Sequence, residues 1–104
     1  MEKINIKDAE IQTLKKIIPF EVKDGEELLT VIIVSEDQKV HYSFICKDTE
    51  KFNIIENRLY EVYPEYIEKE NYFTVNGSKI NRFKTLKENG IKYSDIIMLN
   101  SKEI

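Results

Sequence analysis

Glycine, proline, cysteine and histidine are all scarce in this sequence of 104 residues, and tryptophan is absent. Three Gly and two Pro are too few for a low-complexity chain, and 41% of the residues are hydrophobic against 34% charged. A domain of this length buries roughly two-thirds of its unfolded surface, so one core can hold it together without metals or disulfides. We therefore expect a single folded globular domain.

Cysteine is limited to Cys46 and histidine to His41. One thiol cannot form an internal disulfide, and iron–sulfur and structural zinc sites are usually built from several cysteines. Cys46 shares an alternating strand face with aromatic residues, which favours a core thiol over a nucleophile or a sulfur carrier. His41 is expected on the outer face of the same strand, and no second group is nominated to orient it as a general base. The sequence thus predicts no catalytic residue, no metal site and no cofactor, and it does not indicate an enzyme.

A strong charge of either sign is also missing, because the net charge is −3 and the two signs are interspersed. Binding to a phosphate backbone requires a basic excess, so we expect no nucleic-acid partner. No uncharged run is long enough to span a membrane, and residues 1–20 lack an apolar signal core. With its single cysteine, the chain is expected in a reducing, cytoplasmic compartment, without a membrane partner.

The first 27 residues differ in pattern from the rest of the chain. We expect residues 1–27 to form an N-terminal extension and residues 28–104 to form the domain itself. The extension is expected to contain a short amphipathic helix, capped by Asp8 and ended by Pro19. The helical face would be formed by Ile11, Leu14, Lys15 and Ile18.

The first part of the domain reads as a hairpin followed by a helix. Residues 28–34 and 40–46 are apolar or alternating runs joined by a polar turn, which predicts two antiparallel strands. The helix is expected over residues 49–63, with Asp48 or Thr49 as its N-cap. Pro64 would end it, because the residue before a proline disfavours the helical conformation. The apolar stripe of this helix would consist of Phe52, Ile55, Leu59 and Tyr63.

The second part of the domain reads as short strands separated by turns. Residues 72–75 predict a third strand, and the Asn-Gly pair after it predicts a tight turn into a short strand at 78–80. Residues 85–90 predict one tight helical turn ending on Gly, and residues 96–99 predict the last strand. The predicted core consists of Phe44, Phe52, Ile55, Leu59, Phe73, Leu86, Ile91, Ile96 and Met98.

This order of elements resembles ubiquitin over about residues 29–100. The residues that carry the resemblance are Asp48-Thr49 before the helix, Asn76-Gly77 after the third strand, Thr85-Leu86, Ile91, and the closing apolar strand. The resemblance implies an α+β fold, namely the ubiquitin-like β-grasp, with a mixed sheet of four to five strands packed on one helix. Ubiquitin and its conjugated relatives end in Gly-Gly, whereas this sequence contains no Gly-Gly pair. We therefore expect a non-conjugated domain, with a free modifier or sulfur-carrier protein as the alternative.

The resemblance also places the first and last strands side by side in the middle of the sheet. Residues 31–34 and 96–99 are apolar throughout, whereas a sheet face that only meets water should be polar. Contiguous apolar surface indicates a protein-interaction module that binds another protein or another domain of the same chain. The expected binding residues are Ile32, Val34, Thr74, Ile97 and Leu99. The alternative is that residues 1–27 cover this face.

Overall fold

The structure is a computed structural model, and it describes residues 9–11 and 20–102. Residues 9–11 are helical. The elements that follow are β1 (Leu28–Ser35), β2 (His41–Lys47), α2 (Phe52–Val62), the 3₁₀ helix η1 (Pro64–Tyr66), β3 (Glu70–Val75), β4 (Ser78–Lys79) and β5 (Ile96–Lys102). The other residues of the predicted N-terminal helix, including Asp8 and Pro19, lie outside the described part of the chain.

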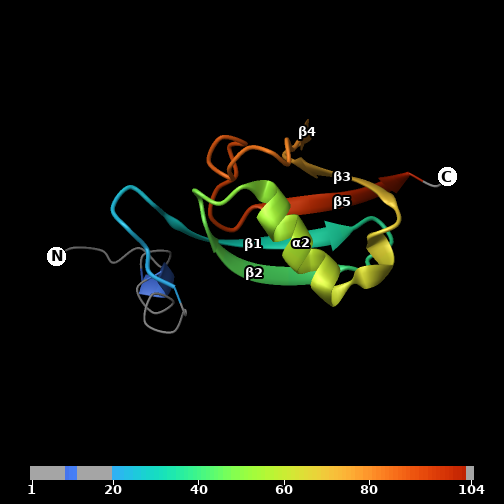
Figure 1. Cartoon of the computed structure of the whole chain (residues 1–104), viewed down its shortest axis with the longest axis horizontal. Coiled ribbons are helices and arrows are strands. Elements are labelled where there is room, and N and C mark those ends of the chain that lie inside the picture. Colours follow the sequence, from blue (N-terminus) through green and yellow to red (C-terminus); the bar gives the residue numbers. More distant parts are fainter. Residues whose placement is uncertain (1–8, 12–19, 103–104) are drawn as a thin grey trace.

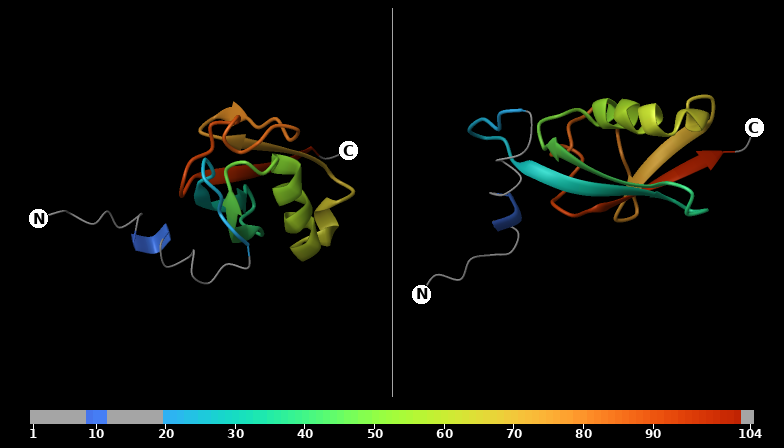
Figure 2. Two further views of the ribbon diagram at one scale, coloured as in Figure 1. Left: turned by 60° about the vertical axis from the view of Figure 1, so that its left-hand side comes forward. Right: turned by 90° about the horizontal axis from the view of Figure 1, so that it is seen from below.

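The strands form one mixed sheet in the order β2-β1-β5-β3-β4. The two central strands, β1 and β5, are parallel, and the other neighbours are antiparallel. Helix α2 crosses one face of this sheet (Figures 1 and 2). The α+β prediction, with up to five strands packed on one helix, is therefore confirmed.

Helix α2 packs through the stripe that its sequence predicted. Phe52, Ile55 and Leu59 are fully buried, and the ring of Phe52 meets that of Phe73 with centroids 4.9 Å apart. The helix ends at Val62, before the Pro64 that starts η1. Burying three such side chains contributes several kcal/mol, since each is worth about 1.5–3 kcal/mol when removed from water.

The predicted N-cap of this helix is wrong. The helix begins at Phe52, and neither Asp48 nor Thr49 caps it. Asp48 instead accepts a hydrogen bond of 2.9 Å from the backbone N–H of Glu27, and Thr49 donates one of 2.5 Å to the carboxylate of Glu26. Both polar side chains therefore form hydrogen bonds with the segment before β1 and not with the N-terminus of the helix.

The loop between β4 and β5 satisfies the start of α2 in place of a side-chain cap. The backbone N–H groups of Phe52 and Asn53 donate hydrogen bonds of 2.9 Å to the carbonyl oxygens of Lys84 and Arg82. The first N–H groups of a helix need such partners from outside the helix. This loop therefore lies beside the first turn of α2, as Figure 1 shows.

The turn between β3 and β4 follows its sequence signal. Asn76 and Gly77 both have positive φ, at 51° and 81°, which is the backbone that a two-residue hairpin needs. The return strand is shorter than predicted, because β4 covers only Ser78–Lys79. The N–H of Ile80 still donates to the carbonyl oxygen of Phe73 at 2.8 Å, and its side chain is buried in the core.

The core lies between α2 and the sheet, and most of its predicted members are confirmed. The confirmed residues are Phe44, Phe52, Ile55, Leu59, Phe73, Leu86 and Ile91. The prediction is wrong for Ile96, which is 58% exposed, and for Met98, which is half-buried. Their places in the core are taken by Ile97 and Leu99.

Candidate functional site

The side of the sheet away from α2 carries a continuous group of apolar side chains. We call this group the open face and define it as Ile32 and Val34 of β1, Thr74 of β3, and Ile96 and Met98 of β5. Figure 2 shows α2 on one side of the sheet, and the open face lies on the other. The open face is the candidate functional site.

The strand register places these residues next to one another. Ile32 is the partner of Ile96 and Val34 is the partner of Met98 in the parallel pair, while Thr74 is the partner of Met98 in the antiparallel pair. Residues directly opposite in an antiparallel pair have Cβ atoms about 4.5–5.5 Å apart and point to the same side of the sheet. The five side chains therefore form one surface that crosses three strands.

The predicted orientation of Ile97 and Leu99 is wrong. Ile97 is 0% exposed and lies opposite Val75, and Leu99 is 2% exposed and lies opposite Phe73. Because Phe73 and Val75 face the helix, their cross-strand partners face it too. A strand shifted by one residue turns every side chain to the other face of the sheet. Ile96 and Met98 therefore occupy the outward positions that were assigned to Ile97 and Leu99.

No signal within the last strand could have given the correct phase. Ile96, Ile97, Met98 and Leu99 are all apolar, so the alternation that usually separates the two faces is absent. For β1, the expectation that Ile32 and Val34 point outward is confirmed in orientation, because Val31 and Ile33 are fully buried. Thr74 also lies on the predicted side, opposite Met98.

Polar residues surround the open face. His41 and Ser43 of β2 are exposed beside it, and they pair with Val34 and Ile32 respectively. At the other edge of the open face, beside β3, the ammonium of Lys79 lies 5.7 Å from the ring centroid of Tyr72. An apolar centre with a polar rim is the usual anatomy of a protein–protein interface.

The described part of the N-terminal segment covers only the end of the sheet where β1 begins. Leu28 points to the open side, yet it is 2% exposed and does not belong to the main core cluster. Its partner Lys47 donates a hydrogen bond to the carbonyl oxygen of Glu21, and its ammonium lies 5.8 Å from the ring centroid of Phe20. Phe20 and Glu21 therefore lie at the end of the sheet where Leu28 is buried, whereas Ile96 stays exposed.

A second contact ties residues 9–11 to the same end of the sheet. The phenol of Tyr93 donates a short hydrogen bond to the carboxylate of Glu10, which raises the pKa of Tyr93. Tyr93 comes just before Ser94, whose N–H donates to the carbonyl oxygen of Thr30 in β1. The described residues of the extension thus gather where β1 begins, as Figure 2 shows.

The cysteine and the histidine differ in their surroundings. Cys46 is fully buried, and desolvation raises the pKa of its thiol from 9.0 to about 12. A thiol with this pKa carries almost no thiolate at neutral pH, and the thiolate is the nucleophile. The prediction of a core thiol is confirmed. His41 is exposed on the outer side of β2, as the sequence indicated.

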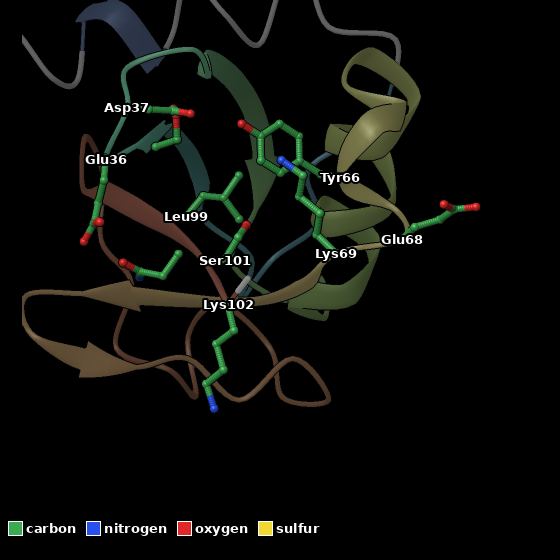
Figure 3. A pocket seen from close by; sticks show the side chains of 10 residues that line it. Glu36, Asp37, Tyr66, Glu68, Lys69, Leu99, Ser101 and Lys102 are labelled. Atoms are coloured by element: carbon green, nitrogen blue, oxygen red, sulfur yellow. The ribbon is translucent and has the colours of Figure 1, made fainter. Parts of the chain in front are cut away.

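A hollow of about 560 Å³ lies at the other end of the sheet, between the β1–β2 turn, residues 66–69 and the end of β5. Figure 3 shows the side chain of Lys69 beside Tyr66, whose ring centroid is 4.5 Å from the ammonium. Across the hollow, hydrogen bonds from the Ser35 hydroxyl and the Lys39 backbone lower the pKa of Asp37. Ligand pockets are usually lined by apolar residues, so this charged hollow is a weaker candidate than the open face.

Residues 9–11 and 20–102 contain no group of three or more His, Cys, Asp or Glu side chains that could hold a metal ion. In the same ranges, no helix is long and apolar enough to cross a membrane.

Comparisons with solved structures identify folds similar to this one. A designed protein based on ubiquitin matches with a TM-score of 0.63 and 16% sequence identity, over 79% of this chain and 95% of that one. The solution structure of the ubiquitin-like domain of an Arabidopsis thaliana protein matches with a TM-score of 0.65 and 15% identity, over 82% of this chain and 88% of that one. No family model and no curated protein sequence matches the chain. At identities this low, the likeness concerns the fold alone.

Proposed function

We propose that this chain, which has the ubiquitin-like β-grasp fold, is a protein-interaction module that binds its partner through the open face. The observation that carries the proposal is the exposure of Ile96, at 58%, next to Ile32 in an apolar surface on the central strands. A sheet face in contact with water alone is expected to be polar. A contiguous apolar surface with a polar rim is typical of a binding site.

The rigidity of the open face supports this proposal. Four of its five residues lie on β1 and β5, each of which is paired on both sides in the sheet. A surface that is already ordered loses little conformational entropy when it binds, so more of the contact free energy appears as affinity. We therefore expect binding without rearrangement of the sheet.

Two features support binding over catalysis. The only thiol, that of Cys46, is buried and protonated at neutral pH. The only histidine, His41, is exposed, and its imidazole makes no hydrogen bond with another described residue. A general base or an activated nucleophile needs a second group that positions it. The partner in this proposal is another protein or another domain of the same chain.

Site-specific photocrosslinking tests the proposal. A benzophenone side chain placed at Ile96 should crosslink to a partner in the cells that make this protein, and Met98→Lys should abolish the adduct. The same probe at Asn57, which is exposed on α2 and away from the sheet, is the matched control. An adduct that forms equally at both positions, or one that survives Met98→Lys, contradicts a partner site on the open face.

A further inference from the structure

Phe83 is the most exposed large apolar side chain among the described residues, at 71%. It belongs to the loop between β4 and β5, beside the first turn of α2 (Figure 1). The open face lies on the opposite side of the sheet from α2, so Phe83 is not part of it. A single exposed apolar residue is common on protein surfaces. Its surroundings therefore decide whether it has a role.

The loop that carries Phe83 is held in place by hydrogen bonds. The side chain of Asn81 accepts a hydrogen bond of 3.0 Å from the N–H of Phe83, and the side chain of Asn89 bonds both the N–H and the carbonyl of Asn81. The carbonyl oxygens on either side of Phe83, those of Arg82 and Lys84, accept the first N–H groups of α2. The ring is thus presented to solvent by a fixed backbone, which lowers the entropy lost on binding.

The chain around Phe83 is basic, although the protein as a whole is acidic. Residues 76–87 contain four cations and no acid, while the net charge of the chain is −3. Lys84 follows Phe83 directly, and Lys51 reaches the same place because its backbone pairs with that of Thr85. Both lysines are exposed, and neither forms a salt bridge within the described residues.

Unlike the two lysines, Arg82 already pairs with a carboxylate of this protein, so its charge is less available to a partner. Its Nε lies 3.3 Å from the carboxylate of buried Glu56, and its terminal nitrogen donates to the carbonyl of Asn71. One acid, Glu88, lies near both lysines: hydrogen bonds from the backbone and side chain of Thr85 lower the pKa of Glu88, and Lys84 and Lys51 lower it further. Two ammonium groups therefore share one carboxylate, which leaves this surface cationic.

We propose that Phe83, Lys51 and Lys84, which we call the Phe83 cluster, bind an acidic segment of another protein. An apolar side chain of that segment packs on the ring of Phe83, and its carboxylates pair with the two ammonium groups. Aromatic residues are enriched in the buried centres of protein interfaces, where a few side chains dominate the binding energy. This surface is separate from the open face, so the protein can hold two partners, or two parts of one partner, at once.

The charge of the Phe83 cluster favours a short acidic protein segment over a polyanion as its partner. A nucleic acid or an anionic membrane presents many negative charges and needs a wide basic surface. Here the cluster offers two cations that share the single carboxylate of Glu88, in a protein of net charge −3. A short peptide with a few carboxylates needs only these two cations, whereas a long polyanion would also extend over the acidic rest of the surface.

Amide NMR of the whole chain, titrated with a synthetic peptide in which Phe and Leu are flanked by Asp and Glu, tests the proposal. We expect saturable shifts at the amides of Lys51, Phe83 and Lys84, and binding that weakens as salt is added. Phe83→Ala should weaken binding about tenfold, as expected for a central anchor. Ile67→Ala removes another apolar side chain that is 61% exposed, and it should have no effect.

Three results would overturn the proposal. The first is an absence of shifts in the Phe83 cluster, or shifts confined to the open face. The second is equal binding by a peptide whose Asp and Glu are replaced by Asn and Gln. The third is tighter binding, with the same shifts, by phosphatidylserine vesicles or by a single-stranded oligonucleotide, which would assign the cluster to a membrane or a nucleic acid. A thermal midpoint of Phe83→Ala close to that of the wild type shows that the variant is folded.

Discussion

The phenol of Tyr60 donates a hydrogen bond of 2.6 Å to the carboxylate of Glu56, one turn earlier on α2. Glu56 is only 6% exposed, and its other carboxylate oxygen lies 3.3 Å from Nε of Arg82. The side-chain amide of Asn71 donates to the same phenol at 2.9 Å. One hydroxyl therefore joins the helix to β3, on the side of α2 where the loop with Phe83 also docks.

Tyr60→Phe should lower the free energy of unfolding by about 1–3 kcal/mol, because it leaves a buried carboxylate oxygen of Glu56 without its donor. Urea denaturation of the two proteins measures the difference. Tyr72→Phe is the matched control, since the hydroxyl of Tyr72 bonds no other described residue. Equal stability of Tyr60→Phe and the wild type would mean that this network does not hold the helix to the sheet.

Ile97→Ala should lower the free energy of unfolding by about 2–5 kcal/mol, because Ile97 is fully buried between β1 and β3. Ile96→Ala, one residue earlier, should change it by less than about 0.5 kcal/mol, since most of that side chain is exposed. The same denaturation experiment applies to both variants. The reverse order of effects would mean that Ile97, and not Ile96, points outward on the open face.

The buried thiol should make stability depend on alkaline pH. Desolvation raises the pKa of Cys46 from 9.0 to about 12, so the folded protein keeps a proton that the unfolded chain loses. The unfolded state then binds fewer protons, and stability is full below pH 9 and declines between about pH 9 and 12. Cys46→Ala should show a smaller decline over this range in unfolding measurements. Identical slopes would indicate that the thiol ionises freely in the folded state.

The segment before β1 should be anchored by an acid with the opposite pH dependence. The hydroxyl of Thr49, together with the backbone of Lys23 and the ammonium of Lys47, lowers the pKa of Glu26 from 4.5 to about 2. The stability that Glu26 contributes is therefore present above pH 4.5 and is lost as the pH falls towards 2.

A Glu26→Gln variant checks this directly. It should be less stable than the wild type at pH 7, and the difference should shrink as the pH falls towards 2, because Glu26 then becomes protonated and loses its charge. Glu61→Gln, at an exposed position on α2, should show no such convergence. A titration of Glu26 by NMR that gives an ordinary carboxyl pKa would contradict the anchoring contacts with Thr49 and Lys47.

Much of the fold could be predicted from local sequence because local chemistry decides it. The helix stripe of Phe52, Ile55 and Leu59 has helical spacing, and Pro64 can only follow the end of the helix. Asn76-Gly77 adopts positive φ at low cost, so the turn into β4 was predictable. The order of strands and helix along the chain follows from such signals, and the resemblance of that order to ubiquitin implied the β-grasp topology.

The tertiary structure alone decided three other features. The polar side chains of Asp48 and Thr49 carry a capping signal, but partners distant in sequence take both of them. The loop that carries Phe83 lies beside α2 because backbone N–H groups of the helix donate to its carbonyl oxygens, which are distant in sequence. The outward phase of β5 has no sequence signal at all. Four apolar residues in a row carry no alternation, so pairing with β1 and β3 had to decide that Ile96 and Met98, rather than Ile97 and Leu99, face outward.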